Sequence, residues 1–265
     1  MADEDLLDLA REVALEAAAL VRERRAGHVV VAATKSSDID VVTEADRAAE
    51  QLIYRRITEA RPGDGFLGEE GAAAESTTGV TWVVDPIDGT VNFLYDLPQY
   101  AVSIAATRDG ESVVGVVVNV ATGEVFSARR GGGAYVDDRA LRVRDDVELG
   151  QRLVATGFHY VREVRARQAS AVAAMLTQVR DVRRLGSAAL DLCAVAAGRV
   201  DAYLEEGVKP WDVAAGTLLV TEAGGRVESR SGAGGTTCVV AAPASGFDAF
   251  DELARRCGFF AENGE

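Results

Sequence analysis

The sequence predicts an α/β protein in which helices and strands pack in layers. Two segments with helical spacing of apolar residues come first, a β-rich run extends to residue 143, and strands and helices alternate after residue 150. Of the 265 residues, 48% are hydrophobic, which is enough for a sizeable core. This length allows one large domain or two smaller ones that share an interface.

The N-terminal segment predicts a long helix that ends near Arg25. Its acidic start suits the positive end of a helix dipole. A strand is expected next, at residues 29–33. The apolar residues that recur at helical spacing are Leu6, Leu9, Val13, Ala17, Leu20 and Val21.

A second helix is predicted to begin at Thr43, because Thr43 and Asp46 have the spacing of a capping box. A turn and the short strand 66–68 follow and lead into Glu69-Glu70. An acidic pair in this position is usually part of a solvated loop. A strand end can also place such a pair beside other acids.

The most informative segment contains the apolar strand 82–84. The strand is expected to stop at Asp85, which precedes a proline, and Asp88 lies three residues further on. Gly89-Thr90 then opens a predicted helix. Two acids at a strand exit can bind a hard cation, and amides at a helix start can hold a phosphate. The pattern alone also fits an Asx turn, so the metal interpretation depends on further acids.

β-Branched residues and turns dominate the chain from there to residue 143 and indicate an antiparallel sheet. The predicted strands are 101–107, 113–120 and 124–128. The polar stretch 144–150 is the predicted boundary between two halves. We expect an N-terminal half, residues 1–147, and a C-terminal half, residues 148–265, that pack as one compact unit.

Beyond the boundary, strands and helices alternate, which favours a layered α/β sandwich. The predicted strands are 153–156, 182–185, 201–204 and two near residues 226 and 239. The predicted helices are 162–179, 187–197, 213–222 and a last one from Phe247.

Asp212 is predicted at the start of helix 213–222. An N-cap is the plain explanation, and a capping carboxylate keeps a second oxygen that could join the acids of the central segment in a metal cage. Thr90 could position a water nucleophile whose proton Asp46 accepts, although both residues also fit as capping residues. Lys35 is most simply a surface lysine.

Other phosphatase signatures are weaker. Cys193 and Arg199 have the C-x5-R spacing of cysteine-dependent phosphatases, but the intervening residues are Ala-rich and helical, which favours core packing. The two histidines, His28 and His159, lie in no relay or metal-binding pattern. No glycine-rich loop for a nucleoside triphosphate or a dinucleotide is present.

The formal net charge of −14 argues against direct binding of nucleic acid or an anionic membrane. An acidic protein with a phosphorylated substrate needs local positive charge, which bound divalent cations would supply. The three cysteines are scattered and mostly in apolar settings, which fits reduced thiols. The acidic N-terminus is unlike a secretory signal, and no stretch is apolar enough for a membrane span. We therefore expect a cytoplasmic protein.

Three ordered motifs now resemble the signatures of the inositol monophosphatase family. They are G-E-E at 68–70, W-V-V-D-P-I-D-G-T-V-N-F at 82–93 and W-D-V-A-A-G-T-L-L-V-T-E-A-G-G at 211–225. The likeness extends over essentially the whole chain. It includes T-G-F-x-Y at 156–160, where His159 stands in place of the proline usual in bacterial relatives. The resemblance implies a five-layer αβαβα sandwich that usually forms homodimers.

Carried over by motif, the resemblance implies a Mg²⁺-dependent, lithium-sensitive phosphatase with two or three metal ions per active site. The implied metal ligands are Glu69, Asp85, the backbone carbonyl of Ile87, Asp88 and Asp212. The implied catalytic residues are Thr90, paired with Asp46, together with Glu70 and Lys35. The implied substrate contacts are Asp88, Gly89, Thr90, Gly186, Ser187, Ala188 and Glu205, with Glu206 as a possible alternative to Glu205.

Inositol monophosphate is the substrate that the motifs favour. Histidinol phosphate, fructose 1,6-bisphosphate and 3′-phosphoadenosine 5′-phosphate are alternatives, because relatives share the chemistry and differ in the leaving group. A non-enzymatic role as a regulatory binding protein is a further alternative. It is disfavoured because all the acids of the implied catalytic set are present together.

Overall fold

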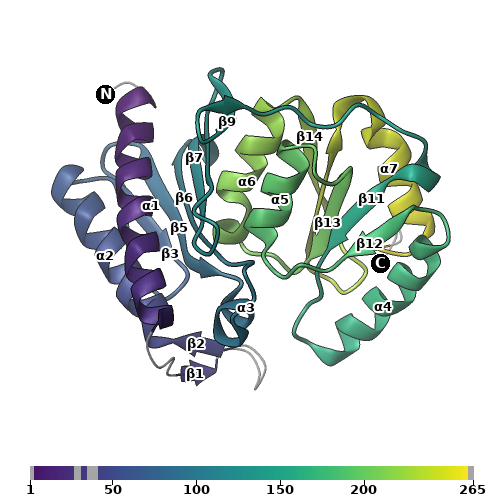
Figure 1. Cartoon of the computed structure of the whole chain (residues 1–265), viewed down its shortest axis with the longest axis horizontal. Coiled ribbons are helices and arrows are strands. Elements are labelled where there is room, and N and C mark those ends of the chain that lie inside the picture. The colour runs from purple at the N-terminus through teal and green to yellow at the C-terminus, as the bar shows by residue number, and fades with distance from the viewer. Residues whose placement is uncertain (1–2, 27–30, 35–40, 262–265) are drawn as a thin grey trace.

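The computed structural model describes residues 3–26, 31–34 and 41–261. In it the chain forms five layers, in which helices and two β-sheets alternate (Figure 1). This confirms the predicted fold class. The helices are α1 (Asp3–Ala26), α2 (Glu44–Ala60), α3 (Thr90–Tyr95), α4 (Arg162–Leu176), α5 (Ala188–Ala196), α6 (Pro210–Glu222) and α7 (Phe247–Arg256).

The first sheet has the strand order β10-β9-β8-β7-β6-β5-β3-β4. All its neighbouring strands are antiparallel except β3 and β5, which run parallel. Helices α1 and α2 cover one face and α5 and α6 the other (Figure 1). The strands are β3 (Gly65–Gly68), β4 (Ala73–Ala74), β5 (Val80–Asp88), β6 (Ala101–Arg108), β7 (Glu111–Asn119), β8 (Val125–Arg129), β9 (Gly133–Val136) and β10 (Arg139–Ala140).

The second sheet has the order β12-β11-β13-β15-β14 and is mixed. Strand β11 runs parallel to β12 and β13, whereas β15 is antiparallel to both of its neighbours. Helices α4 and α7 form the outer layer beside it (Figure 1). The strands are β11 (Leu153–Thr156), β12 (Asp181–Arg183), β13 (Ala202–Glu206), β14 (Gly225–Ser231) and β15 (Thr237–Pro243).

A small two-stranded sheet of β1 (Val31–Thr34) and β2 (Val41–Thr43) lies before α2. The strand predicted at 29–33 overlaps β1, and its first two residues lie outside the described residues. His28 and Lys35 also lie outside them. Within the described part of the chain, no helix combines the length and the apolarity that crossing a bilayer requires.

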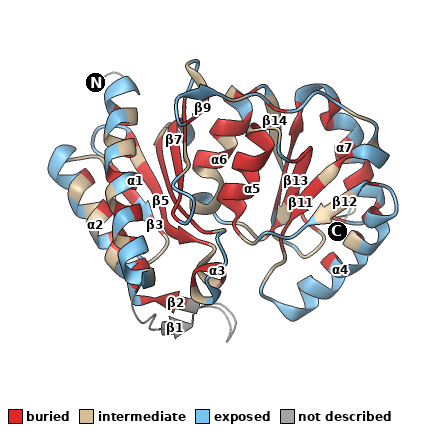
Figure 2. Cartoon of the chain, in the orientation of Figure 1, coloured by how far each residue is buried: buried red, intermediate tan, exposed pale blue. Residues whose placement is uncertain are grey.

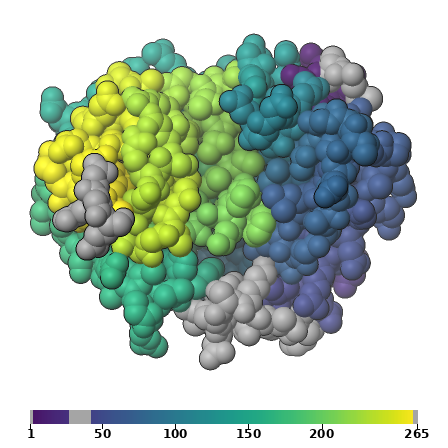
Figure 3. All heavy atoms as spheres, turned by 180° about the vertical axis from the view of Figure 1, so that it is seen from behind, coloured from purple at the N-terminus to yellow at the C-terminus, as the bar shows by residue number. Residues whose placement is uncertain are grey.

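The central helical layer lies between the sheets, and Figure 2 shows α5 in the colour of buried residues and α6 partly so. Every residue of α5 is buried, which is the pattern of a helix covered on all sides. From behind, the light-green atoms of the α6 region lie between the yellow C-terminal part and the blue N-terminal part (Figure 3). The middle layer therefore joins the two sheets through apolar contact.

Candidate active site

Strand pairing places Glu69 beside Asp85. Strands β3 and β5 are parallel, with Gly68 opposite Val84, so the residues that follow leave the same edge of the sheet. The Glu69 amide donates to the Val84 carbonyl at 3.2 Å. Asp85 is 2% exposed, and its Oδ1 accepts the Ile87 amide at 3.0 Å. These two acids, 16 positions apart in sequence, thus face one another.

The proline after Asp85 predicted that the strand ends at Asp85, and this prediction is wrong. Strand β5 continues to Asp88, with an irregularity in its pairing between Asp85 and Asp88. Its neighbour β3 ends at Gly68, opposite Val84, so beyond that point one side of β5 has no strand to pair with. A proline is tolerated there because no ladder hydrogen bond is lost.

The segment after Asp88 turns sharply at Gly89. Gly89 is the N-cap of α3 and has a φ of +90°, and a Cβ there would lie 2.8 Å from the Gln99 carbonyl oxygen. Only glycine fits this position. Thr90 is therefore the first residue of α3 and does not cap it, which corrects the capping alternative.

The Thr90 hydroxyl lies 3.2 Å from Asp46 Oδ1 and 3.0 Å from the Ile87 carbonyl oxygen. Asp46 is fully buried, and its other oxygen accepts the Thr43 amide at 2.8 Å and the Thr43 hydroxyl. The capping box and the Thr90 contact thus coexist in one carboxylate. Burial raises the pKa of Asp46 to about 6, against the hydrogen bonds from Thr43, and the charges of Glu70 and Glu69 add to that rise.

Asp88 belongs to the first half but is held by the second. Its Oδ2 accepts the Ser187 hydroxyl at 2.5 Å and the Ala189 amide at 2.7 Å, at the N-terminus of α5. Burial raises the pKa of Asp88 to about 6 despite these donors. The Ser187 side chain, predicted as a substrate contact, is thus engaged with Asp88. Sequence reasoning missed Ala189, because nothing local links it to a residue about 100 positions away.

Gly186 lies against the Gly89 turn. The Asn92 side chain donates to the carbonyls of Gln99 and Leu185, at 2.7 and 2.8 Å, and so ties the start of α3 to the segment before α5. The structure therefore brings Gly186, Ser187 and Ala188 to the edge of the carboxylate cluster.

Asp212 is not an N-cap, as its simplest interpretation predicted. Helix α6 begins at Pro210, three residues earlier than expected, and Asp212 lies in its first turn. Its Oδ2 accepts the Lys209 amide at 2.7 Å. Burial raises the pKa of Asp212 well above its usual range, with Asp88 adding like charge. Asp212 thus faces Asp88 from the other half of the molecule.

Two neighbouring glutamates on β13 have different surroundings. Glu206 Oε1 accepts the amides of Gly234 and Thr236, at 2.8 and 3.2 Å, so this side chain holds a turn. Glu205 points the other way, and its Oε2 accepts the Tyr203 hydroxyl at 3.2 Å. Burial raises the pKa of Glu205 to about 7. Of the two, Glu205 faces the carboxylate cluster.

Asp191 is a further acid that the sequence analysis missed. It is 1% exposed on α5, and neither of its oxygens has a hydrogen-bond partner among the described residues. Burial, followed by the charges of Glu205 and Asp88, raises its pKa well above the usual range. Its signal in the sequence is a single acid within the apolar run A-A-L-D-L-C.

The acids form a crowded cluster that fits a hard cation in chemical type. Burial, and then the charges of Glu69, Asp88 and Asp212, raise the pKa of Asp85 well above its usual range. All the donors are carboxylate or carbonyl oxygens, which Mg²⁺ prefers, and its charge would relieve their repulsion. Within the described ranges, however, no three of them stand close enough together to enclose a metal ion.

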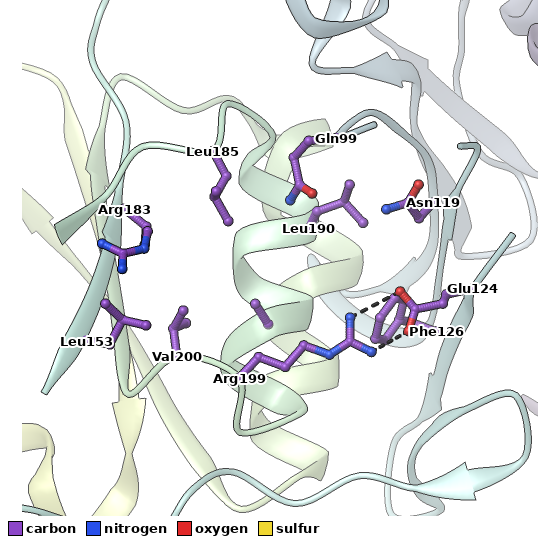
Figure 4. Close-up of a pocket in the computed structure, with 11 residues that line it drawn as sticks. Gln99, Asn119, Glu124, Phe126, Leu153, Arg183, Leu185, Leu190, Arg199 and Val200 are labelled. Carbon is purple, nitrogen blue, oxygen red and sulfur yellow. Dashed lines mark hydrogen bonds and ion pairs between the residues drawn. The ribbon is translucent and has the colours of Figure 1, made fainter. Parts of the chain in front are cut away.

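A pocket of 270 Å³ opens elsewhere, beside α5, with lining residues from β8 on one side and from β11 and β12 on the other (Figure 4). It is lined by Leu190 and Phe126 and by the Arg199–Glu124 ion pair, and it contains none of the candidate site residues. Nearby Cys193 is 1% exposed in the core, and burial raises the pKa of its thiol. The C-x5-R signature is thus core packing, as predicted.

The layered fold and its cluster of buried carboxylates define a metal-dependent phosphatase of the sandwich type. Three comparisons agree. The inositol monophosphatase family model matches residues 2–255, so the chain belongs to that family, as the motifs predicted.

Named relatives and a solved structure match most of this chain. An inositol-1-monophosphatase of Mycobacterium leprae is 49% identical over 90% of this chain and 89% of its own. The structure of Mycobacterium tuberculosis SuhB matches with a TM-score of 0.84 and 44% identity, over 97% of this chain and 98% of that one. A protein of Xylella fastidiosa named Nus factor SuhB is 44% identical over 75% of this chain and 72% of its own.

Proposed function

We propose that this phosphatase hydrolyses inositol monophosphate to inositol and phosphate with Mg²⁺. The observation that carries the proposal is the convergence of Glu69, Asp85, Asp88 and Asp212, from both halves of a chain whose relatives are named inositol-1-monophosphatase. Two or three Mg²⁺ ions would be held by these four side chains and by the Ile87 carbonyl. When bound, the metal would supply Lewis acidity and lower the pKa of a bound water.

Thr90 and Asp46 would handle the proton of the attacking water. The Thr90 hydroxyl lies within hydrogen-bond distance of Asp46, so a water that donates to Thr90 is linked through it to a buried carboxylate. A pKa of about 6 makes Asp46 a suitable proton acceptor near neutral pH. Glu70 lies near enough to raise that pKa by its charge and so supports the basicity of Asp46.

The amides of Gly89 and Thr90, at the start of α3, would bind the phosphate. On the alcohol side, Glu205 would accept hydrogen bonds from inositol hydroxyls, and Gly186 and Ala188 would contact the ring. The Ser187 hydroxyl would act through Asp88, because it already donates to that carboxylate. We assign Lys35 to the same site from its motif alone.

The same proposal includes a homodimer in the cytoplasm that is inhibited by lithium. The three cysteines are buried and form no disulfide, which suits a reducing compartment. The dimer and the lithium sensitivity rest on the family resemblance.

The test is phosphate release from four esters, each with Mg²⁺ and with a chelator. The panel contains inositol 1-phosphate, histidinol phosphate, fructose 1,6-bisphosphate and 3′-phosphoadenosine 5′-phosphate. We expect Mg²⁺-dependent turnover that is fastest with inositol 1-phosphate. Preference for another ester would keep the mechanism and replace the substrate.

A regulatory binding role is the second candidate, because one relative is named a Nus factor. Catalysis and binding can coexist on one chain. The panel of four phosphate esters therefore decides whether the chain is a phosphatase, and it separates the two candidate functions only if no ester is hydrolysed. A folded protein that releases phosphate from none of the four esters would favour the binding role.

A further inference from the structure

Helix α2 carries two buried acids one turn apart. Asp46 is fully buried and Glu50 is 3% exposed. Residues four apart lie on the same face of a helix. Asp46 contacts Thr90, while Glu50 turns to the segment that follows β3. One helix face thus reaches two parts of the proposed site.

The Glu50 carboxylate holds the turn that contains Glu69 and Glu70. Its Oε2 accepts the Glu70 amide at 2.7 Å, and its Oε1 accepts the Ala72 amide at 2.9 Å. The Gly68 amide donates to the Ala72 carbonyl at 2.8 Å and closes the turn. Hydrogen bonds to a charged acceptor are stronger than neutral ones, so both oxygens act as anchors.

Glycine is the only residue type that fits at position 68, next to the Glu50 carboxylate. A Cβ at position 68 would lie 2.3 Å from Glu50 Oε2, and so any side chain would push the carboxylate away. This contact gives the glycine of the G-E-E motif a physical reason. The motif depends on Glu50, which lies 18 positions earlier.

Glu50 occupies an electrostatically unfavourable place. Burial raises its pKa, and the like charges of Glu70 and Glu69 add to that rise. Both donors that it satisfies are backbone amides of one short turn. A charged side chain kept there serves the geometry of that turn more than the stability of the core.

We propose that Glu50 is a positioning residue for the metal site, because it anchors the Glu69–Glu70 turn so that Glu69 faces Asp85. Since Glu50 shares one face of α2 with Asp46, the same helix also sets the place of the Thr90–Asp46 pair relative to that ligand. This inference rests on the proposed function. It adds a residue to which no metal or substrate contact is assigned.

The first test is a titration of the metal-free full chain with Mn²⁺. Electron paramagnetic resonance of the free ion measures how much Mn²⁺ is bound. Glu50→Gln keeps the shape of the side chain but offers one acceptor in place of two. We expect its Mn²⁺ affinity to fall about tenfold, as for other residues that orient metal ligands. The Mg²⁺ concentration for half-maximal activity should rise by the same factor, while kcat at saturating Mg²⁺ changes less than about threefold.

Glu222→Gln is the matched control. Glu222 accepts the amides of Gly131 and Gly133, at 2.8 and 2.9 Å, with its two oxygens, so it anchors a turn in the same way. It lies ten residues from Asp212, near the other end of α6, or about 15 Å along the helix axis. We expect it to lose stability but to keep its Mn²⁺ affinity. Equal Mn²⁺ affinity in the Glu50 and Glu222 variants would overturn the inference.

Gly68→Ala is the second variant and keeps the test decisive if Glu50→Gln does not fold. It displaces the carboxylate without removing it, so we expect the same loss of Mn²⁺ affinity. The double variant, Glu50→Gln with Gly68→Ala, should lose no more Mn²⁺ affinity than the single variant that binds Mn²⁺ more weakly. The reason is that both substitutions act through the same contact. Additive losses would overturn the inference. A folded wild-type chain that binds no Mn²⁺ would overturn the proposed function and the inference together.

Discussion

The two halves of the molecule treat their buried acids differently. In the first half, Asp46 and Asp85 are held by donors from their own half, and in Asp46 both oxygens have partners. In the second half, Glu205 has a single hydroxyl partner, and Asp191 has none among the described residues. Asp46 and Asp85 are thus held by protein donors, whereas Glu205 and Asp191 keep acceptor oxygens that no donor of the described residues fills. A ligand with many hydroxyl groups can satisfy such acceptors.

The largest effect on activity is expected for a substitution of Asp85, in the first half. Asp85→Asn keeps an oxygen for the Ile87 amide but removes a charge from the carboxylate cluster. We expect kcat to fall at least about 1,000-fold, which is about 4 kcal/mol. The melting temperature of the metal-free variant should not fall, because a buried like charge is gone. Near-normal turnover in a steady-state assay would disprove the assignment.

The neighbouring glutamates of β13 sharpen the contrast between structural and functional acids. Glu206→Gln removes the charge from an acceptor of three donors in one turn. We expect it to cost about 2 kcal/mol of unfolding free energy, measured by urea denaturation. Its kcat and KM should stay within about twofold of wild type. A loss of activity without a loss of stability would place Glu206, not Glu205, in the site.

The free acids predict a pH dependence of stability in the metal-free protein. The folded state raises the pKa of Glu205 to about 7 by burial, so this group stabilises the fold below its unfolded pKa. That contribution is lost as the pH rises through 7. Between pH 4.5 and pH 8, the wild-type protein should lose unfolding free energy through Glu205. Allowing for partial exposure of this side chain, we expect Glu205→Gln to avoid about 2 kcal/mol of that loss. Parallel denaturation curves at both pH values test this, and an equal pH dependence in both proteins would contradict it.

The smallest effect is expected on substrate affinity. Glu205→Gln should raise KM for inositol 1-phosphate about tenfold, or about 1.4 kcal/mol, and change kcat by less than about threefold. In the proposed role, the carboxylate would accept hydrogen bonds from hydroxyl groups of the leaving alcohol and would touch no reacting atom. The reverse pattern, a fall in kcat at constant KM, would move Glu205 into the chemical step.

Local patterns predicted the fold and much of the candidate cluster, since strand exits, turns and capping boxes depend on neighbouring residues. The capping box at Thr43 and Asp46 is confirmed for this reason. The predicted start of α6, at residue 213, is wrong, since the helix begins at Pro210. Pro210 could have indicated this start, because proline favours the first turn of a helix. The Asp88–Ser187 and Glu50–Glu70 contacts join distant segments, and no local pattern announces them.

The partners of Asp88 come much later in the chain, which matters for biosynthesis. Its two donors lie at the start of α5, and Asp212 follows in α6. During translation, the proposed ligands Glu69, Asp85 and Asp88 emerge well before Ser187, Ala189 and Asp212. A nascent chain therefore cannot assemble the site until synthesis has passed Asp212. We therefore expect a fragment that ends before Asp212 to release no phosphate from the four esters of the panel.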